Sequence, residues 1–117
     1  MKPVPLEIGY REIAPSSVVL TLSGRLMLGP EGEQLESVVD TLLAQGYRRF
    51  IFELSGITHI DSTGIGRCIA SLNKIMAAGG KLHMAAAAKA VREGFRVTRL
   101  DRVFRFFDDT AAAQAAL

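Results

Sequence analysis

Apolar and polar residues alternate along residues 4–11, which is the two-residue period of a strand with one solvated face. Pro5 has no N–H to donate to a neighbouring strand, so we expect this strand at the edge of a sheet. The turn-forming residues 14–17 separate it from a second apolar run at 18–22. Such a short connection favours an antiparallel hairpin.

The pattern then changes to the spacing of an amphipathic helix. This helix is predicted to begin at Gly29-Pro30, because proline suits the first helical position, and to end at Gly46. Residues 50–54 are nearly all apolar, which is typical of a strand buried on both faces of a parallel sheet. The apolar stripe of the helix consists of Leu35, Val38, Val39, Leu42 and Leu43.

Helices and strands continue to alternate in the second half of the chain. A strand is predicted at 81–85, a helix at 89–97 and a strand at 103–107. Asp108-Asp109-Thr110 is suited to cap a final alanine-rich helix. A longer helix precedes these elements, from about residue 62 to 78, with a buried stripe formed by Ile65, Ile69, Leu72 and Met76.

The resulting order is β-β-α-β-α-β-α-β-α. Strands that alternate with helices require right-handed crossovers and parallel pairing. The sequence therefore predicts an α/β fold in a single domain over residues 1–117, with a five-stranded, mixed but mostly parallel sheet flanked by four helices. In such a sheet the loops at 24–29, 55–61 and 86–88 gather at one edge, where ligands and partners usually bind.

Charge and composition narrow the function. With 14 basic and 12 acidic side chains the net charge is only +2, so we expect no nucleic-acid partner. No apolar run approaches the roughly 18 residues of a membrane span, and the start of the chain lacks a signal-type apolar segment. We therefore expect a cytoplasmic protein without membrane contact. The single cysteine, Cys68, excludes an intrachain disulfide and a multi-thiolate zinc site, and we expect neither metal nor cofactor.

Arginines at helical spacing form a basic stripe, namely Arg92, Arg96 and Arg99. A solvated helix face is the ordinary reason for such a stripe. As a binding surface it suits an acidic protein better than nucleic acid, because the chain offers no element that reads a groove.

The most distinctive segment is Asp61-Ser62-Thr63-Gly64-Ile65-Gly66, between the buried strand and the long helix. Asp61 or Ser62 suits the helix N-cap. Each glycine in a first helical turn costs up to about 1 kcal/mol relative to alanine, so two of them suggest a close approach by another group. That group is the protein's own sheet, a phosphate or the backbone of a partner. The segment matches neither phosphate-binding glycine motif nor the Gly-x-Ser-x-Gly of hydrolases, and His59 is the only base near Ser62 in the sequence.

This segment resembles the Asp-Ser-Ser/Thr/Ala-Gly-Leu/Ile-Gly signature of STAS domains, the anti-sigma factor antagonists. The resemblance extends over nearly the whole chain. Gly24-Arg25-Leu26 is similar to the Gly-x-Leu/Ile at the end of the family's second strand, and residues 50–54 to its central strand. Gly79-Gly80-Lys81-Leu82 resembles the Gly-Gly-x-Leu turn that follows the long helix.

The resemblance implies a partner-switching protein without enzymatic activity. Ser62 corresponds to the serine that a GHKL-type serine kinase, which is also the anti-sigma factor, phosphorylates. Phosphorylation abolishes binding to that kinase, and a phosphatase, with the PP2C type as the expected class, restores it. A phosphoserine carries about −1.5 to −2 charges, which a helix N-terminus tolerates without unfolding. The residues expected to form the partner-binding surface are Gly24, Arg25, Met27, Asp61, Thr63, Gly64, Ile65, Gly66 and Arg67.

One residue departs from the family pattern. Met27 stands where many phosphorylated members have an aspartate. This difference keeps a second interpretation open, in which the chain is a STAS scaffold or sensor that binds proteins or a small ligand and Ser62 is never modified. A third interpretation, a small enzyme that uses His59 as a base, has only sequence proximity in its favour. The sequence leaves the oligomeric state open.

Overall fold

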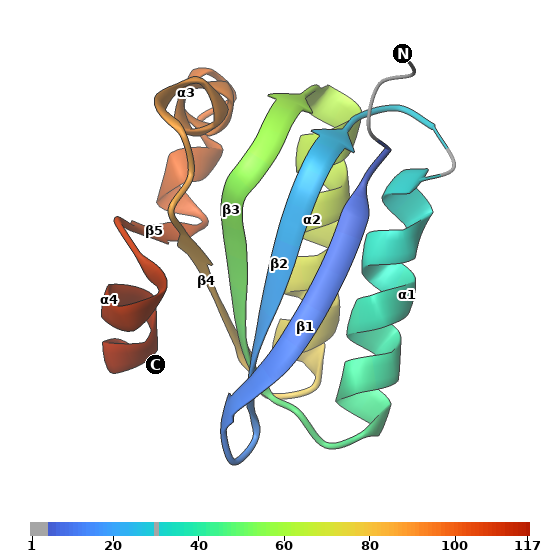
Figure 1. Cartoon of the computed structure of the whole chain (residues 1–117), viewed down its shortest axis with the longest axis vertical. Coiled ribbons are helices and arrows are strands. Elements are labelled where there is room, and N and C mark those ends of the chain that lie inside the picture. The colour runs from blue at the N-terminus through green and yellow to red at the C-terminus, as the bar shows by residue number, and fades with distance from the viewer. Residues whose placement is uncertain (1–4, 30) are drawn as a thin grey trace.

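The computed structural model describes residues 5–29 and 31–117, and shows a single layer of strands with helices packed on it (Figure 1). The sheet has the order β1-β2-β3-β4-β5. β1 is antiparallel to β2, and the remaining neighbours are parallel. The strands are β1 (Glu7–Ala14), β2 (Ser17–Leu26), β3 (Arg49–Ile60), β4 (Lys81–Ala85) and β5 (Arg105–Phe107).

In the described part of the chain, four helices accompany the sheet, as predicted. They are α1 (Glu31–Ala44), α2 (Ser62–Ala77), α3 (Lys89–Val97) and α4 (Thr110–Ala115), with a 3-10 turn, η1, at Leu100–Arg102. The predicted fold class, the opening hairpin and the edge position of the first strand are therefore confirmed. Val4 and Pro30, which the sequence assigns to the first strand and to the helix start, lie outside the described residues.

The two faces of the sheet are covered unequally, and the alternation of side chains along each strand explains how. Phe50 and Phe52 of β3 face a large core that α1, α2 and α3 complete, whereas Ile51 between them faces a small cluster closed by Ala113 of α4. In Figure 1, α1 and α2 lie side by side against one face of the sheet, and α3 stands near the upper ends of β3 and β4. The larger core therefore lies between the sheet and these three helices.

The predicted stripe of α2 is partly wrong. Met76 is 60% exposed, and the buried apolar residues of α2 are Ile65, Cys68, Leu72 and Ile75. The predicted Ile69 is partly buried and packs against the same core. On a helix the residue that follows Leu72 on the same face lies either three or four positions later. Ile75 and Met76 both satisfy this spacing, so the sequence pattern alone does not choose between them. The expectation that Cys68 is a small core residue is confirmed, since it is fully buried.

Two predicted loops are largely strand. β2 continues to Leu26 and β3 to Ile60, although 24–29 and 55–61 are predicted as loops. Register shifts near Ser23 and Gly24 let the pairing continue past residues of weak strand propensity. Gly56 fits here because a Cβ at this position would lie 2.6 Å from the Cβ of Ser23. Gly24 and Gly56, which suggest loops in the sequence, thus belong to a closely packed pair of strands with bulges.

The last predicted strand is too long. β5 contains only residues 105–107, because η1 and the buried Phe104 occupy the chain before it. Within the described part of the chain, no helix has the length and apolar character needed to cross a membrane.

Candidate functional site

The ends of β2 and β3 and the beginning of α2 meet at the upper edge of the sheet (Figure 1). Ser62 is the first residue of α2 and its side chain is exposed. The sequence-predicted phosphoacceptor therefore has solvent access at a helix N-terminus. Backbone N–H groups at such a terminus have no partner within the helix and favour an anion.

Asp61, and not Ser62, caps α2. Its Oδ1 accepts a hydrogen bond from the N–H of Gly64 at 2.8 Å, and its Oδ2 accepts one from the N–H of Leu28 at 3.0 Å. One carboxylate thus joins the start of α2 to the segment that follows β2. Partial desolvation raises the pKa of Asp61, but the hydrogen bonds from Leu28 and Gly64 outweigh it and hold this pKa below its ordinary value.

The two glycines of the segment, Gly64 and Gly66, have different surroundings. A Cβ at Gly64 would lie 1.9 Å from the carbonyl oxygen of Leu26, so the close approach inferred from the sequence is made by the protein's own sheet. At Gly66 a Cβ would meet nothing within 4 Å, and this residue is exposed. Packing therefore explains Gly64 and leaves Gly66 as open surface one turn beyond Ser62.

Three of the predicted partner-binding residues are buried. Gly24 has a φ of +97° and accepts a hydrogen bond from Thr58 Oγ1 at 3.1 Å, Gly64 lies against Leu26, and Ile65 belongs to the core. These residues set the shape of the edge and do not present side chains to a partner.

The remaining predicted residues reach the surface to different degrees. Arg25 is exposed, with its guanidinium 3.5 Å from the sulfur of Met27, which is half-buried. Thr63 is also half-buried. Arg67 points toward α1, where it pairs with Glu36 at 3.4 Å. The structure therefore brings Arg25 and Met27 to the same edge as Ser62 and turns Arg67 toward a neighbouring helix.

Leu28 is a surface residue that the sequence reasoning missed. Its side chain is 79% exposed, while its N–H is bound to the Asp61 carboxylate. An apolar side chain held on the surface by its own backbone is suited to contact another protein. The only signal in the sequence is a leucine within a predicted loop, between Met27 and Gly29.

The hydrogen-bond contact of His59 is with its neighbour Thr58. Its Nδ1 lies 3.0 Å from Thr58 Oγ1, and within the described residues no hydrogen bond joins it to Ser62. The arrangement thus offers an exposed hydroxyl at the start of a helix, on the surface of the upper edge of the sheet.

The STAS domain family model matches residues 11–113. The chain therefore belongs to the STAS domain family, as the sequence resemblance indicates. A relative from Thermotoga maritima, provisionally named an anti-sigma factor antagonist, is 29% identical over 76 residues, which cover 65% of this chain and 67% of the relative.

Solved structures of low sequence identity share the fold. The unphosphorylated form of the anti-sigma factor antagonist SpoIIAA has a TM-score of 0.78 at 20% identity, over 94% of this chain and 96% of that chain. The phosphorylated form of Bacillus SpoIIAA has a TM-score of 0.72 at 19% identity, over 95% of this chain and 100% of that chain. A sulfate transporter family protein from Wolinella succinogenes has a TM-score of 0.79 at 16% identity, over 91% of this chain and 88% of that chain. At these identities the likeness establishes the fold alone.

Proposed function

We propose that this STAS protein is an anti-sigma factor antagonist that binds its partner through the surface around Ser62 and is released when Ser62 is phosphorylated. The partner is an anti-sigma factor that is also a GHKL-type serine kinase, and a PP2C-type phosphatase reverses the modification. The protein acts by binding and not by catalysis. The observation that carries the proposal is the exposed hydroxyl of Ser62 at a helix start that Asp61 already caps.

The physical argument separates the fold from the contact surface. Because Asp61 supplies the cap, a phosphate on Ser62 removes no hydrogen bond that holds α2 in place. The helix dipole favours the added negative charge, so we expect the domain to stay folded. A partner that covers Ser62 would have to bury a group carrying about two negative charges, which is strongly unfavourable without a matching cation.

Two relatives support the proposal. The name of the Thermotoga maritima relative assigns it an anti-sigma factor antagonist role. SpoIIAA, which shares the fold, has been solved in unphosphorylated and phosphorylated forms. These facts concern those proteins, and they make the same role the first one to test in this chain.

The test uses candidate anti-sigma factor kinases from the same genome. We expect one of them, with ATP and Mg²⁺, to phosphorylate the protein, and peptide mapping to locate the phosphate on Ser62. Ser62→Ala should abolish the modification. Ser62→Asp should weaken the complex at least about tenfold in calorimetry, because it places a charge in the contact.

Ser37→Asp is the matched control. It adds the same charge at an exposed serine of α1 and should leave partner affinity unchanged. Phosphate at another residue, or equal weakening by both aspartate variants, would contradict the proposal.

A second candidate function is a STAS scaffold or sensor module in which Ser62 is never modified. Met27 in place of the usual aspartate favours it, and so does the shared fold of a sulfate transporter family protein. Under this alternative Ser62→Asp should barely change assembly with the partner, and no kinase should modify the chain.

A further inference from the structure

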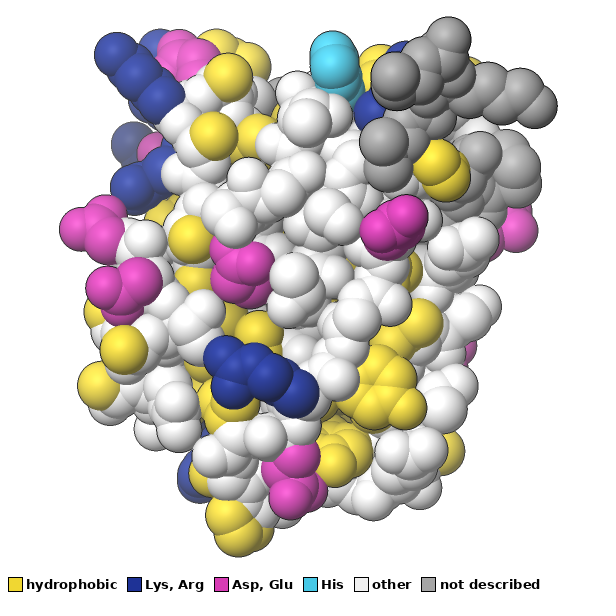
Figure 2. Space-filling model, in the orientation of Figure 1, with side chains coloured by type: hydrophobic (Ala, Val, Ile, Leu, Met, Phe, Trp, Pro, Cys, Tyr) yellow, Lys and Arg dark blue, Asp and Glu magenta, His cyan; other side chains and the backbone are white. Residues whose placement is uncertain are grey.

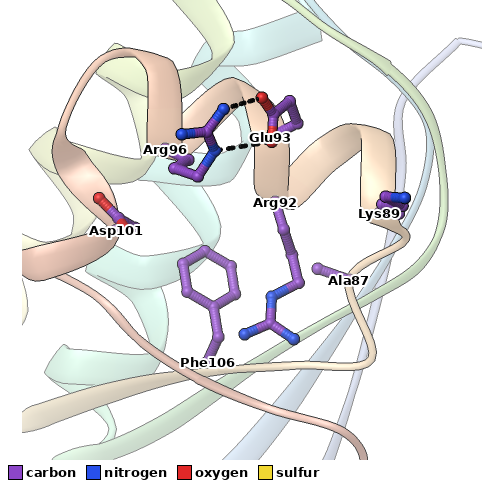
Figure 3. Close-up of a pocket in the computed structure, with 7 residues that line it drawn as sticks. All are labelled: Ala87, Lys89, Arg92, Glu93, Arg96, Asp101 and Phe106. Carbon is purple, nitrogen blue, oxygen red and sulfur yellow. Dashed lines mark hydrogen bonds and ion pairs between the residues drawn. The ribbon is translucent and has the colours of Figure 1, made fainter.

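A hollow of about 510 Å³ lies beside α3, at the end where β4 leaves the sheet. Its lining comes from α3, from the segment between β4 and α3, from η1 and from β5 (Figure 3). Gly94, on the other side of α3, packs toward Ile60 and Ile65 near the start of α2. The helix therefore separates the hollow from the Ser62 surface. The lining residues are Ala87, Lys89, Arg92, Glu93, Arg96, Asp101 and Phe106.

Arg92 is the central cation of the hollow. Its guanidinium carbon lies 5.3 Å from the centre of the Phe106 ring, and that ring packs edge-on against the buried Phe95 at 5.2 Å. The stacking holds the guanidinium in one place. Asp108 is 3.9 Å away and 97% exposed, so it neutralises Arg92 only weakly. Within the described residues, no hydrogen bond uses the guanidinium N–H groups of Arg92.

Arg96 differs from Arg92 because its guanidinium is paired with a carboxylate of the same helix. Glu93 accepts two hydrogen bonds from it, one from Nε and one from a terminal nitrogen, and Figure 3 draws both. The hydrogen bond from Arg96 lowers the pKa of Glu93, and the same contact raises the pKa of Arg96. Since this pair neutralises itself, the cations Lys89 and Arg92 remain, with the carboxylate of Asp101 in the lining and that of Asp108 at 3.9 Å from Arg92. In Figure 2 dark blue side chains gather at the upper left of the molecule, where α3 lies in Figure 1.

We propose that this hollow binds a small organic anion. Its carboxylate or phosphate group is held by the Arg92 guanidinium and the Lys89 ammonium, and its apolar part lies against Phe106 and Ala87. A guanidinium presents parallel N–H donors that match either oxyanion, and a preorganised one loses little freedom on binding. The volume falls within the range of small-molecule sites, which is roughly 300–1,000 Å³.

The concave shape favours a small ligand over a protein segment. Phe106 and Ala87 give the hollow an apolar floor beside its cations, the combination that small-molecule sites use for affinity and orientation. Ala88, the N-cap of α3, makes no side-chain hydrogen bond to the first turn of the helix. The inference does not depend on phosphorylation of Ser62.

The test is a titration of the ¹⁵N-labelled protein followed by NMR, with phenyl phosphate and benzoate as probes. We expect saturable shifts of the amides around Ala87, Arg92 and Phe106, and the stronger of the two probes identifies the preferred oxyanion. Arg92→Gln should weaken the binding of that probe about tenfold or more, because it removes the charged fork and leaves a shorter, neutral side chain. Arg102→Gln removes the same charge from η1, outside the lining, and should change the affinity less than about twofold.

Three results would overturn the inference. The first is that the amide shifts do not saturate with either probe below about 10 mM. The second is that Arg92→Gln and Arg102→Gln weaken probe binding equally, which would indicate a diffuse positive field. The third is binding of a glutamate-rich peptide at these residues while neither small probe binds. That result would make the hollow a protein-docking surface.

Discussion

At the start of α2 the chain is fixed by its own backbone, whereas the hollow beside α3 is lined mainly by long side chains. Asp61 binds the N–H groups of Leu28 and Gly64, and Gly64 lies against the Leu26 carbonyl. Arg92 and Lys89 reach the hollow through long side chains, and the contacts that hold the Arg92 guanidinium are the Phe106 ring and the exposed Asp108 carboxylate. The two regions lie on opposite sides of α3 and differ in what a substitution can disturb.

This difference predicts how stability and binding are distributed. Contacts between backbone groups have little room to relax, so changes near Gly64 should act on folding. Exposed side chains contribute little to stability, so changes at Arg92 or Leu28 should act on binding. The variants below test this separation, from the largest expected effect to the smallest.

Gly64→Ala should cause the largest loss of stability. The new Cβ would meet the Leu26 carbonyl oxygen at 1.9 Å, and neither backbone can move without opening the junction of β2 and α2. We expect a loss of about 3 kcal/mol or more in the free energy of unfolding, measured by urea denaturation.

Gly66→Ala is the matched control, because it makes the same change two residues later in open space. It should raise stability by up to about 1 kcal/mol through helix propensity. A similar loss in both variants would mean that the first turn of α2, and not its contact with Leu26, limits substitution.

Asp61→Asn tests the carboxylate that joins α2 to the segment after β2. Asparagine can still cap Gly64, but its NH₂ group cannot accept the N–H of Leu28, so we expect a loss of about 1 kcal/mol at pH 7. The pKa of Asp61 is lowered by folding, so its contribution is complete above the unfolded pKa of about 4. It is lost as the pH falls through the lower, folded pKa.

The difference in unfolding free energy between wild type and Asp61→Asn should therefore shrink below about pH 4, in denaturant titrations at several pH values. Asp108→Asn, which makes the same change at a side chain that is 97% exposed, is the matched control. A difference that stays constant down to pH 2 would show that the charge of Asp61 is not what holds Leu28.

The constrained junction at the start of α2 could be predicted from the sequence, because the residues that indicate it are neighbours in the chain. Asp61 and Gly64 serve one helix turn, and local rules for capping and glycine indicate a constrained junction. Which group approaches Gly64 was not predictable, because Leu26 lies far away in the sequence and reaches the site through a bulged strand pair. The same bulges explain why two strands extend beyond their predicted ends.

The hollow was not predictable for a related reason. Ala87 and Phe106 come from separate elements, and the final turn before β5 was itself assigned to a strand. The arginine periodicity indicates a basic helix face, but only the structure distinguishes Arg92, stacked on Phe106, from Arg96, paired with Glu93. Hydrophobic periodicity likewise places Met76 instead of Ile75 on the buried stripe, since it defines a helix face only to within one residue.

Leu28→Ala should have the smallest effect on stability and a clear effect on binding. The side chain is 79% exposed, so its truncation should change the free energy of unfolding by less than about 0.5 kcal/mol. The Asp61 carboxylate binds the backbone N–H of Leu28, which the substitution retains, so the segment should keep its position. If the partner covers the Ser62 surface, the loss of this apolar side chain should weaken the complex about tenfold in calorimetry. Met76→Ala removes another exposed apolar side chain from the far end of α2 and should leave the affinity unchanged. Unchanged binding in both variants would exclude Leu28 from the contact and restrict the docking surface to the helix start itself.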